Sequence, residues 1–387
     1  MKGLNRRNFL RTSAAGVAGI ALTNNMNASN TAKEPNQTSI ITRKLGNTGI
    51  ELPVLSIGCG EVDSPAVIKA ALKVGITHFD TAYRYQQGNS EKMLGKTLKD
   101  VDRDSFIIST KVVRQDTDEK FLEMLDESLA RLQMDYVDIL YMHGMSKAEA
   151  IKNPANIAQL QKAKDLGKAK HIGFSTHKNE PEVIEAAIEA GAYEVILTAI
   201  NFKHDDADAI KKQIALASKK GIGIVAMKVM AGGYLDKEKT KTVNHAAALK
   251  WILEDEHICT TIPSMVNLEQ LQINMAVLKD VQLSSDEKND LALAKNEQGL
   301  FCNDTCNTCV TDCTKNLPVP ELMRAYMYSY GYRNPLQAKE LITTLNIENN
   351  PCDDCGSCTV SCTKSFDVAA KIKDISRLTI IPNDFLA

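Results

Sequence analysis

An alternation of short β-branched runs with amphipathic stretches is the feature that most constrains the fold of this chain. Eight such runs occur between about residues 40 and 293, and each is followed by a stretch with helical periodicity. Residues 121–132, for example, repeat Phe and Leu at helical spacing with charges between them. The predicted strands are 55–58, 78–81, 106–110, 137–143, 171–174, 194–200, 223–227 and 259–262. Eight βα units in about 250 residues predict an α/β fold of the (β/α)8 TIM-barrel type.

The segment before the first of these strands has a different pattern. Residues 40–51 place a Gly-Asn-Thr-Gly turn between two arms of alternating apolar residues. This pattern predicts a β-hairpin, which we expect to close the floor of the barrel.

Size and charge limit what else the chain can be. Its 387 residues, 44% of them hydrophobic, suffice for one large barrel and a smaller domain. The formal net charge is −2, the charges are mixed along the chain, and aromatic residues make up only 5%. With neither a basic stripe nor an aromatic platform, we expect no nucleic-acid partner.

Titratable side chains stand where three consecutive predicted strands end. The second strand leads into Asp80 and Tyr85, the third ends at Lys111, and the fourth ends at His143. Chemistry in such barrels gathers at the carboxyl ends of the strands. Each residue alone has an ordinary structural explanation, but together they can deliver a proton to a carbonyl oxygen while a hydride arrives from the other side. We expect Lys111 to favour the Tyr85 phenolate, Asp80 to hold Lys111, and His143 to orient the substrate oxygen.

Eight of the ten cysteines form two short runs near the C-terminus. Thiolates two or three residues apart can wrap one small metal centre, so the runs predict two iron–sulfur clusters. The predicted ligands are Cys302, Cys306, Cys309, Cys313, Cys352, Cys355, Cys358 and Cys362. Zinc ribbons need only two separated C-x2-C pairs, and a disulfide across C-x2-C constrains little chain, but both alternatives remain open.

The first residues carry an export pattern. Twin arginines, Arg6 and Arg7, precede Phe9-Leu10 and an apolar stretch at 14–22. This order is typical of a twin-arginine signal, which carries folded proteins across the membrane, and a chance Arg-Arg pair in a disordered tail is the alternative. We therefore expect a periplasmic protein with its signal and linker in residues 1–32. The apolar stretch is shorter than the roughly 20 residues that span a bilayer, so no membrane span is expected.

The strand-end residues of the barrel resemble those of the aldo-keto reductases. The resemblance covers roughly residues 40–293 and rests on Phe79-Asp80-Thr81-Ala82, on Asn89-Ser90-Glu91, on Ser109-Thr110-Lys111 and on Asp138 through His143. It implies oxidation or reduction of a carbonyl or alcohol substrate, such as a sugar, with NADP or NAD as the cofactor. By position, Tyr85 is then the general acid and base, with Asp80, Lys111 and His143 beside it.

The resemblance also implies a nucleotide site, although the match is weaker there. Thr176 and Met227-Lys228 are substitutions of the usual residues, and no Lys or Arg near Ser264 is placed to clamp a 2′-phosphate. The sequence therefore does not decide between NAD and NADP. The implied cofactor-binding residues are Ser175, Thr176, Asn201, Met227, Lys228, Met230, Gly232, Gly233, Pro263, Ser264, Gln270 and Asn274.

Residues 300–387 are similar to the ferredoxin-like domain that ends one subgroup of that family. The second cysteine run has the bacterial ferredoxin spacing, in which the fourth cysteine binds the other cluster. The resemblance therefore implies two [4Fe–4S] clusters, one held by Cys302, Cys306, Cys309 and Cys362, the other by Cys352, Cys355, Cys358 and Cys313. We expect helices near 321–331 and 337–345 to dock this domain beside the barrel and to border the mouth of the active site.

Three functions fit these patterns. The favoured one is a barrel oxidoreductase whose clusters pass electrons between a bound nicotinamide and an external redox partner. The others are a barrel reductase with purely structural clusters and an electron-transfer module without catalysis. Substrate identity, reaction direction, redox partner, signal cleavage site and oligomeric state are not encoded in any pattern that we find.

Overall fold

Eight parallel strands form the central sheet of the molecule. A computed structural model describes residues 40–234, 241–302 without 297–300, and 308–386. The strands pair in sequence order along the sheet. They are β3 (Ile57–Gly58), β4 (His78–Asp80), β5 (Ile107–Val112), β6 (Val137–Met142), β7 (Ala169–Thr176), β8 (Val195–Ala199), β9 (Gly223–Met227) and β10 (Thr260–Thr261).

Backbone hydrogen bonds close this sheet into a barrel. Ser56 N donates to Thr261 O over 2.9 Å, and Thr261 N donates to Val54 O over 3.0 Å, so the first strand pairs with the last. Each predicted strand overlaps one observed strand, and the (β/α)8 prediction is confirmed for this part of the chain. The two strands at the closure, β3 and β10, are shorter than predicted, because only two residues of each pair regularly with the neighbouring strand.

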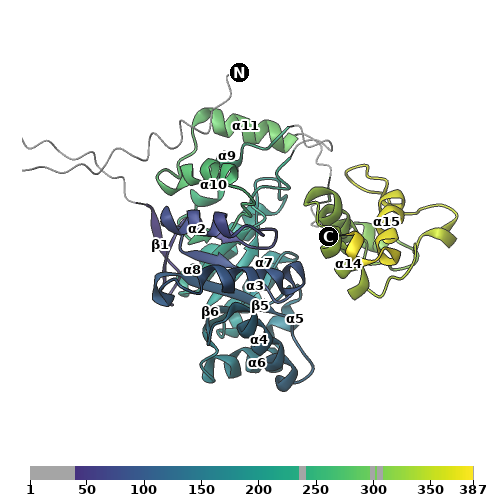
Figure 1. The fold of residues 1–387 in the computed structure, drawn as a ribbon. Helices are drawn as coiled ribbons and strands as arrows, with labels where there is room; N and C mark the ends of the chain where they lie inside the picture. The colour runs from purple at the N-terminus through teal and green to yellow at the C-terminus, as the bar shows by residue number, and fades with distance from the viewer. Residues whose placement is uncertain (1–39, 235–240, 297–300, 303–307, 387) are drawn as a thin grey trace, which may run out of the picture. The chain divides into compact units, whose positions relative to one another are not determined.

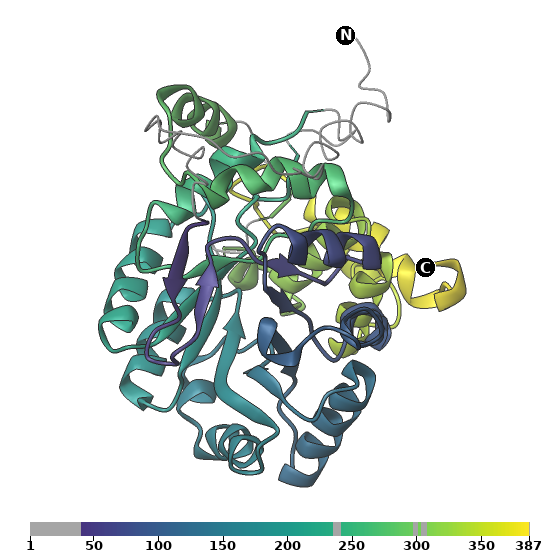
Figure 2. The ribbon, with the colours of Figure 1, turned by 60° about the vertical axis from the view of Figure 1, so that its left-hand side comes forward.

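Helices surround the barrel, as Figure 2 shows. They are α2 (Pro65–Lys73), α3 (Asn89–Leu98), α4 (Asp118–Leu132), α5 (Ala148–Lys152), α6 (Pro154–Asp165), α7 (Glu180–Ala190), α8 (Ala207–Lys219), α9 (His245–Leu253), α10 (Leu268–Asn274) and α11 (Ser285–Asn296). Side-chain caps fix where several begin. Thr117 accepts from Lys120 N at the start of α4, and Asn244 accepts from Ala247 N at the start of α9.

The predicted hairpin forms the floor of the barrel. Strands β1 (Thr42–Lys44) and β2 (Glu51–Pro53) pair in antiparallel fashion. Leu45 and Leu52 are fully buried and pack with residues inside the barrel strands. Gly46 has a φ of +53°, and a Cβ on it would lie 2.3 Å from the carbonyl oxygen of Gly221, so only glycine fits this close approach.

The C-terminal residues form a separate group of helices with its own apolar core (Figure 1). The helices are α12 (Thr308–Asp312), α13 (Val319–Tyr326), α14 (Pro335–Thr344) and α15 (Val368–Ser376). Short helical turns η4 (Met327–Gly331), η5 (Asp353–Cys355), η6 (Arg377–Ile380) and η7 (Asn383–Phe385) join or follow them. Helices near 321–331 and 337–345 are therefore confirmed, except that the first ends in a π-helical turn, η4.

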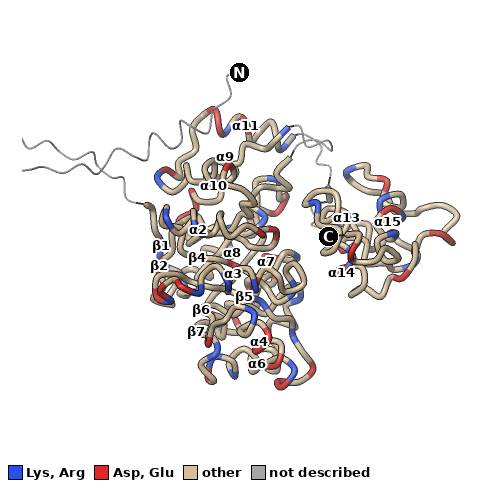
Figure 3. The backbone as a smooth tube through the Cα atoms, viewed as in Figure 1, with Lys and Arg blue, Asp and Glu red and all other residues tan. Residues whose placement is uncertain are grey.

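The described residues, from 40 onwards, all belong to one compact unit. The twin-arginine segment lies in residues 1–39, outside the described part of the chain. In the described part, none of the helices is long and apolar enough to cross a membrane. Acidic and basic residues are interspersed over the helices, as Figure 3 shows.

Candidate active site

Asp80 and Lys111 form a buried ion pair at the carboxyl ends of β4 and β5. Their side chains are each 1% exposed. The Lys111 ammonium also donates to Thr81 O over 2.7 Å, and Asp80 accepts from Ser109 Oγ over 2.6 Å. These extra hydrogen bonds satisfy both charged groups and fix the direction in which Lys111 points.

Tyr85 and His143 complete the group that the sequence predicts. Tyr85 begins the short helix η1 (Tyr85–Gly88) after β4, and the Lys111 Nζ lies 4.6 Å from the centre of its ring. The charge of Lys111 is close enough to the Tyr85 hydroxyl that each group shifts the pKa of the other. The His143 ring lies edge-on to Tyr85, with 6.0 Å between ring centres. The structure thus brings all four residues to one place, where they line one cavity.

Burial determines the protonation of two of these groups. Burial raises the pKa of Tyr85, and the opposing effect of Lys111 is smaller. The expected net shift towards phenolate is therefore not found, and Tyr85 is a protonated phenol at neutral pH. Burial also lowers the pKa of His143 to about 3, helped by the charges of Lys111 and Arg84, so His143 is neutral.

Lys111 shows the opposite balance. Burial alone would lower its pKa, but the neighbouring Asp80 carboxylate and the Tyr85 hydroxyl raise it. Lys111 therefore stays charged. A protonated phenol beside a fixed cation is an arrangement that can release a proton and stabilise the phenolate that remains.

The cavity around this group has a volume of about 430 Å³ and accounts for most of the predicted nucleotide site. Thr176 and Asn201 are not among its lining residues. The Thr176 hydroxyl donates to Lys178 O, and the Asn201 amide donates to Lys228 O. The predicted residues that do line it are Ser175, Met227, Lys228, Met230, Gly232, Gly233, Pro263, Ser264, Gln270 and Asn274.

Two observations fit a nucleotide in this cavity. Asn274 is 2% exposed, and its Oδ1 atom has no hydrogen-bond partner in the described structure. Gly232 and Gly233 follow β9 with φ values of +93° and +78°. A loop of this conformation can present its backbone N–H groups to phosphate oxygens. The cavity therefore offers a hydrogen-bond acceptor without a donor at one wall and a loop suited to bind an anion at another.

A second cavity, of about 650 Å³, lies between the barrel and the C-terminal helices. Tyr85 and His143 line both cavities, so the proposed proton donor stands where the two meet. The barrel supplies residues after β4, β5 and β6 to this cavity, and α13, η4 and α14 supply the opposite wall. This agrees with the expectation that these helices border the mouth of the active site.

Sequence reasoning did not find four residues that line both cavities: Gly60, His177, Tyr328 and Gln337. His177 lies just beyond the end of β7, so a wider search of the strand ends finds it. Tyr328 and Gln337 lie in the helices that we expect at the mouth of the site, but nothing in the sequence indicates which side chains of those helices face it. Only the packing of the C-terminal helices reveals them.

Ion pairs hold these helices against the barrel. Glu321 on α13 pairs with Lys178 over 3.2 Å and with Arg324 over 2.5 Å. Arg324 is 4% exposed and also donates to the backbone oxygen of His177 over 3.4 Å. The loop after β7 is therefore bound directly to α13.

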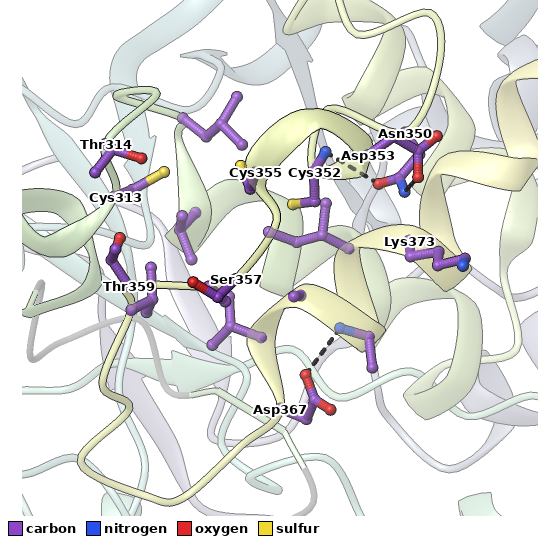
Figure 4. A pocket seen from close by; sticks show the side chains of 18 of the residues that line it. Cys313, Thr314, Asn350, Cys352, Asp353, Cys355, Ser357, Thr359, Asp367 and Lys373 are labelled. Carbon is purple, nitrogen blue, oxygen red and sulfur yellow. Dashed lines mark hydrogen bonds between the residues drawn. The ribbon is translucent and has the colours of Figure 1, made fainter.

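Four cysteines surround a third cavity, of about 350 Å³, inside the C-terminal helices. They are Cys313, Cys352, Cys355 and Cys358, the set that the ferredoxin resemblance implies for one cluster. Figure 4 shows Cys313 facing Cys352 and Cys355 across this hollow. The two cysteine runs are also tied together through Asp312, whose backbone oxygen accepts from Thr359 Oγ1 over 2.6 Å.

The other predicted ligands are less gathered. Cys302 lines a small cavity beside Lys228 and Gly232, and Cys306 lies outside the described residues. In the described part of the chain, Cys313, Cys352, Cys355, Cys358 and Cys362 form no disulfide. Within the described residues, no three His, Cys, Asp or Glu side chains lie close enough to hold a single metal ion. The cluster prediction thus stays a prediction.

The fold and the buried group at its strand ends define a (β/α)8-barrel oxidoreductase that acts on carbonyl groups. The family model described as "Aldo/keto reductase family" matches residues 60–246. The matched residues all lie in the barrel, which is therefore similar to that family.

Known relatives agree with this assignment. L-galactose dehydrogenase of Arabidopsis thaliana is 28% identical over 288 residues, which are 63% of this chain and 90% of that protein. L-glyceraldehyde 3-phosphate reductase of Escherichia coli O157:H7 is 25% identical over 313 residues, 63% of this chain and 89% of that protein. A solved aldo-keto reductase from Bacillus halodurans (holo form) superposes with a TM-score of 0.55 at 22% identity, over 66% of this chain and 96% of that one, and shows the shared fold.

Proposed function

We propose that this protein interconverts a carbonyl compound and its alcohol with a nicotinamide cofactor, and that Tyr85 is the acid and base. The observation that carries the proposal is the place of Tyr85. Its ring centre lies 4.6 Å from the buried Lys111 Nζ, and its protonated phenol stands where the cavity of 430 Å³ meets the cavity of 650 Å³. The first cavity has the fitting features for a nucleotide, and the second is free for a substrate.

The residues of the chain have distinct tasks in this reaction. A bound NAD or NADP supplies the hydride for reduction and accepts it in oxidation. Tyr85 gives its proton to the carbonyl oxygen during reduction and takes a proton from the hydroxyl during oxidation. Lys111, held by Asp80, stabilises the phenolate that forms when Tyr85 has lost its proton. Neutral His143 can donate a hydrogen bond to the substrate oxygen and orient it.

The second cavity favours a polar and uncharged substrate. Its positive and negative lining residues balance. Arg324 pairs with Glu321. Burial raises the pKa of Glu340, and the nearby charge of Arg84 opposes this rise. Amide side chains supply much of the rest, among them Gln86, Gln87, Asn89, Asn334 and Gln337. Such a lining suits a sugar or another hydroxylated aldehyde. Two relatives bear names that specify an L-galactose dehydrogenase and a D-threo-aldose 1-dehydrogenase.

We further propose that the C-terminal residues hold two [4Fe–4S] clusters. Support comes from Cys313, Cys352, Cys355 and Cys358 around one cavity, and from the bond through Asp312 that joins the two cysteine runs. A four-iron cluster is wider than a single ion, so its thiolates stand further apart than the ligands of one metal. Bound clusters supply one-electron carriers. Cys302, which borders the small cavity beside Lys228, brings the first cysteine run next to the nucleotide cavity.

Export by the twin-arginine route is the remaining part of the proposal. Arg6 and Arg7 precede an apolar stretch, and clusters assembled inside the cell require export of a folded protein. In the periplasm, free nicotinamide is scarce. The nucleotide is then held tightly and recycled in place, with electrons passing through the clusters to an external redox partner.

Anaerobic purification tests the proposal. We expect about eight iron and eight acid-labile sulfide atoms per chain, a visible spectrum of clusters, and a nicotinamide nucleotide released on denaturation. Potentiometry should then find a cluster potential that allows exchange with the nicotinamide. Stoichiometric zinc in place of iron would remove the clusters and the electron relay. Iron without a redox-active cluster would leave a barrel reductase whose clusters are structural.

A further inference from the structure

A second lysine–tyrosine pair stands opposite the pair formed by Lys111 and Tyr85. Lys228 lies just after β9, and its Nζ is 5.4 Å from the ring centre of Tyr328, which η4 contributes from the C-terminal helices. Burial lowers the pKa of Lys228, and the nearby Tyr328 opposes this shift. The barrel and the C-terminal helices thus each contribute one residue to this pair.

Tyr328 occupies the same junction as Tyr85. Both line the nucleotide cavity and the second cavity, and they are close enough for the charge of one to affect the pKa of the other. Tyr328 is 8% exposed, and its ring stacks on Tyr332 with 5.8 Å between ring centres. Its position is therefore fixed by packing.

The backbone on both sides of this pair is unusual. Lys228 has a φ of +58°, a conformation that residues other than glycine seldom adopt. Tyr328 lies in a π-helical turn, which is uncommon and is found mostly at functional sites. Such features cost free energy and persist where the surrounding structure holds them. Here they bring a lysine and a phenol together beside the reacting group.

The hydroxyl of Tyr328 is able to bind a substrate. An ammonium group has only donors, so the neighbouring Lys228 cannot accept the proton of this hydroxyl. The Tyr328 O–H is then free to donate, and none of the described residues is found to accept from it. Because its side chain lines both cavities, an oxygen atom of a bound substrate is the natural acceptor.

From these observations we infer that Tyr328, polarised by Lys228, binds a second oxygen atom of the substrate and selects carbonyl compounds that carry a hydroxyl group besides the reacting carbonyl. This inference rests on the proposed function and adds a specificity-determining residue to it. The C-terminal helices then form part of the substrate site, whatever their cysteines bind.

A comparison of two aldehydes in the full-length holoprotein tests the inference. Glyceraldehyde carries hydroxyl groups, and propanal has the same carbon chain without them. In Tyr328→Phe, which keeps the ring and its stacking, we expect kcat/KM for glyceraldehyde to fall by about 10- to 100-fold. For propanal, we expect a change of less than about 3-fold, because no oxygen is there to lose its partner. Comparison of each variant with wild type on the same aldehyde cancels differences in aldehyde hydration.

Tyr330→Phe is the matched control. Tyr330 lies in the same helical turn, is 40% exposed and lines neither cavity, so its loss of hydroxyl should leave both aldehydes unaffected. Equal losses on both aldehydes in Tyr328→Phe would overturn the inference and assign Tyr328 to nucleotide binding or to the fold. Unchanged rates on both would overturn it as well.

A binding measurement separates this inference from the proposed function. If the wild-type protein reduces neither aldehyde, the proposed function fails for these substrates, and saturation-transfer NMR with glycerol and 1-propanol then decides the role of Tyr328. A glycerol signal that exceeds the 1-propanol signal in wild type and is lost in Tyr328→Phe supports the second oxygen site. A signal that the substitution does not change overturns it.

Discussion

Asp80 and Lys111 come from neighbouring strands and pair where almost no water reaches either charge. Lys111 contacts the Asp80 carboxylate, and its Nζ lies 4.6 Å from the centre of the Tyr85 ring. A buried ion pair of this kind adds little to stability compared with apolar side chains, while loss of one partner is costly. Its position beside the proton donor explains why such a pair belongs here.

Replacement of Asp80 by Asn leaves the Lys111 charge buried without its partner. We expect the free energy of unfolding to fall by about 3–5 kcal/mol, measured by denaturant titration. Asp126→Asn is the control, because Asp126 pairs with Lys168 at the surface, where the loss should stay below about 1 kcal/mol. Equal effects of the two substitutions would contradict the burial argument.

Removal of the Tyr85 hydroxyl tests the assignment of the proton donor. In Tyr85→Phe, we expect kcat to fall by about 10²- to 10⁴-fold, because general acid catalysis contributes that much. Nucleotide content should stay the same. Tyr83→Phe is the control, since the Tyr83 hydroxyl donates to Glu127 over 2.7 Å and lines neither cavity. Unchanged turnover in Tyr85→Phe would indicate that the four residues are not catalytic.

The pH dependence of reduction distinguishes the state of His143. Its pKa of about 3 lies below the ordinary value of 6.5, so it stays neutral as the pH falls from 8 to 5. We expect kcat/KM for reduction to show no loss near pH 6.5 from this residue. Glu180, in contrast, is a buried group that titrates near neutrality, because burial raises its pKa to about 7. A loss that disappears in His143→Gln, and not in Glu180→Gln, would refute a neutral His143.

Acid stability should depend on Glu194. Burial alone would raise its pKa, but hydrogen bonds from His171, Lys164 and the Ile172 N–H lower it to about 2. A folded-state pKa below the unfolded value of 4.5 stabilises the protein above pH 4.5, and this stabilisation is lost as the pH falls towards 2. Glu194→Gln should therefore be less stable at neutral pH and show a smaller further loss in that range. Denaturant titrations at several pH values measure the difference.

Cysteine substitution separates the two cysteine sets. In Cys355→Ser, we expect iron per chain to fall by about half, because one of two clusters loses a ligand. Cys259→Ala is the control, since Cys259 is buried near the floor of the barrel and lies far in sequence from both runs. Full iron content in Cys355→Ser would remove this residue from the ligands.

The fold was largely accessible from the sequence, because each barrel strand is a short β-branched run and periodicity reports burial directly. Strand ends were less accurate. The fourth predicted strand extends to His143, whereas β6 ends at Met142, and the two strands at the closure shrink to two residues each. Pairing at the seam of a barrel depends on tertiary geometry, which local patterns do not encode.

The candidate site divides in the same way. Asp80, Lys111 and His143 could be predicted because each stands at a strand end, a position that the fold itself marks. Tyr328 and Gln337 could not, because they reach the site from helices in a different part of the chain. The protonation of Tyr85 was also missed, since a neighbouring lysine is visible in sequence while the larger effect of burial is not.

The wall that α13, η4 and α14 provide has an evolutionary consequence. The barrel holds the proton donor and the predicted nucleotide-binding residues, whereas Tyr328, Asn334 and Glu340 face the second cavity from the C-terminal helices. Substitutions in those helices can change which compounds the protein accepts without disturbing the buried charges beside Tyr85. Among proteins of this architecture, sequence differences in the C-terminal helices should therefore be the first to change substrate preference, because they leave the catalytic residues intact.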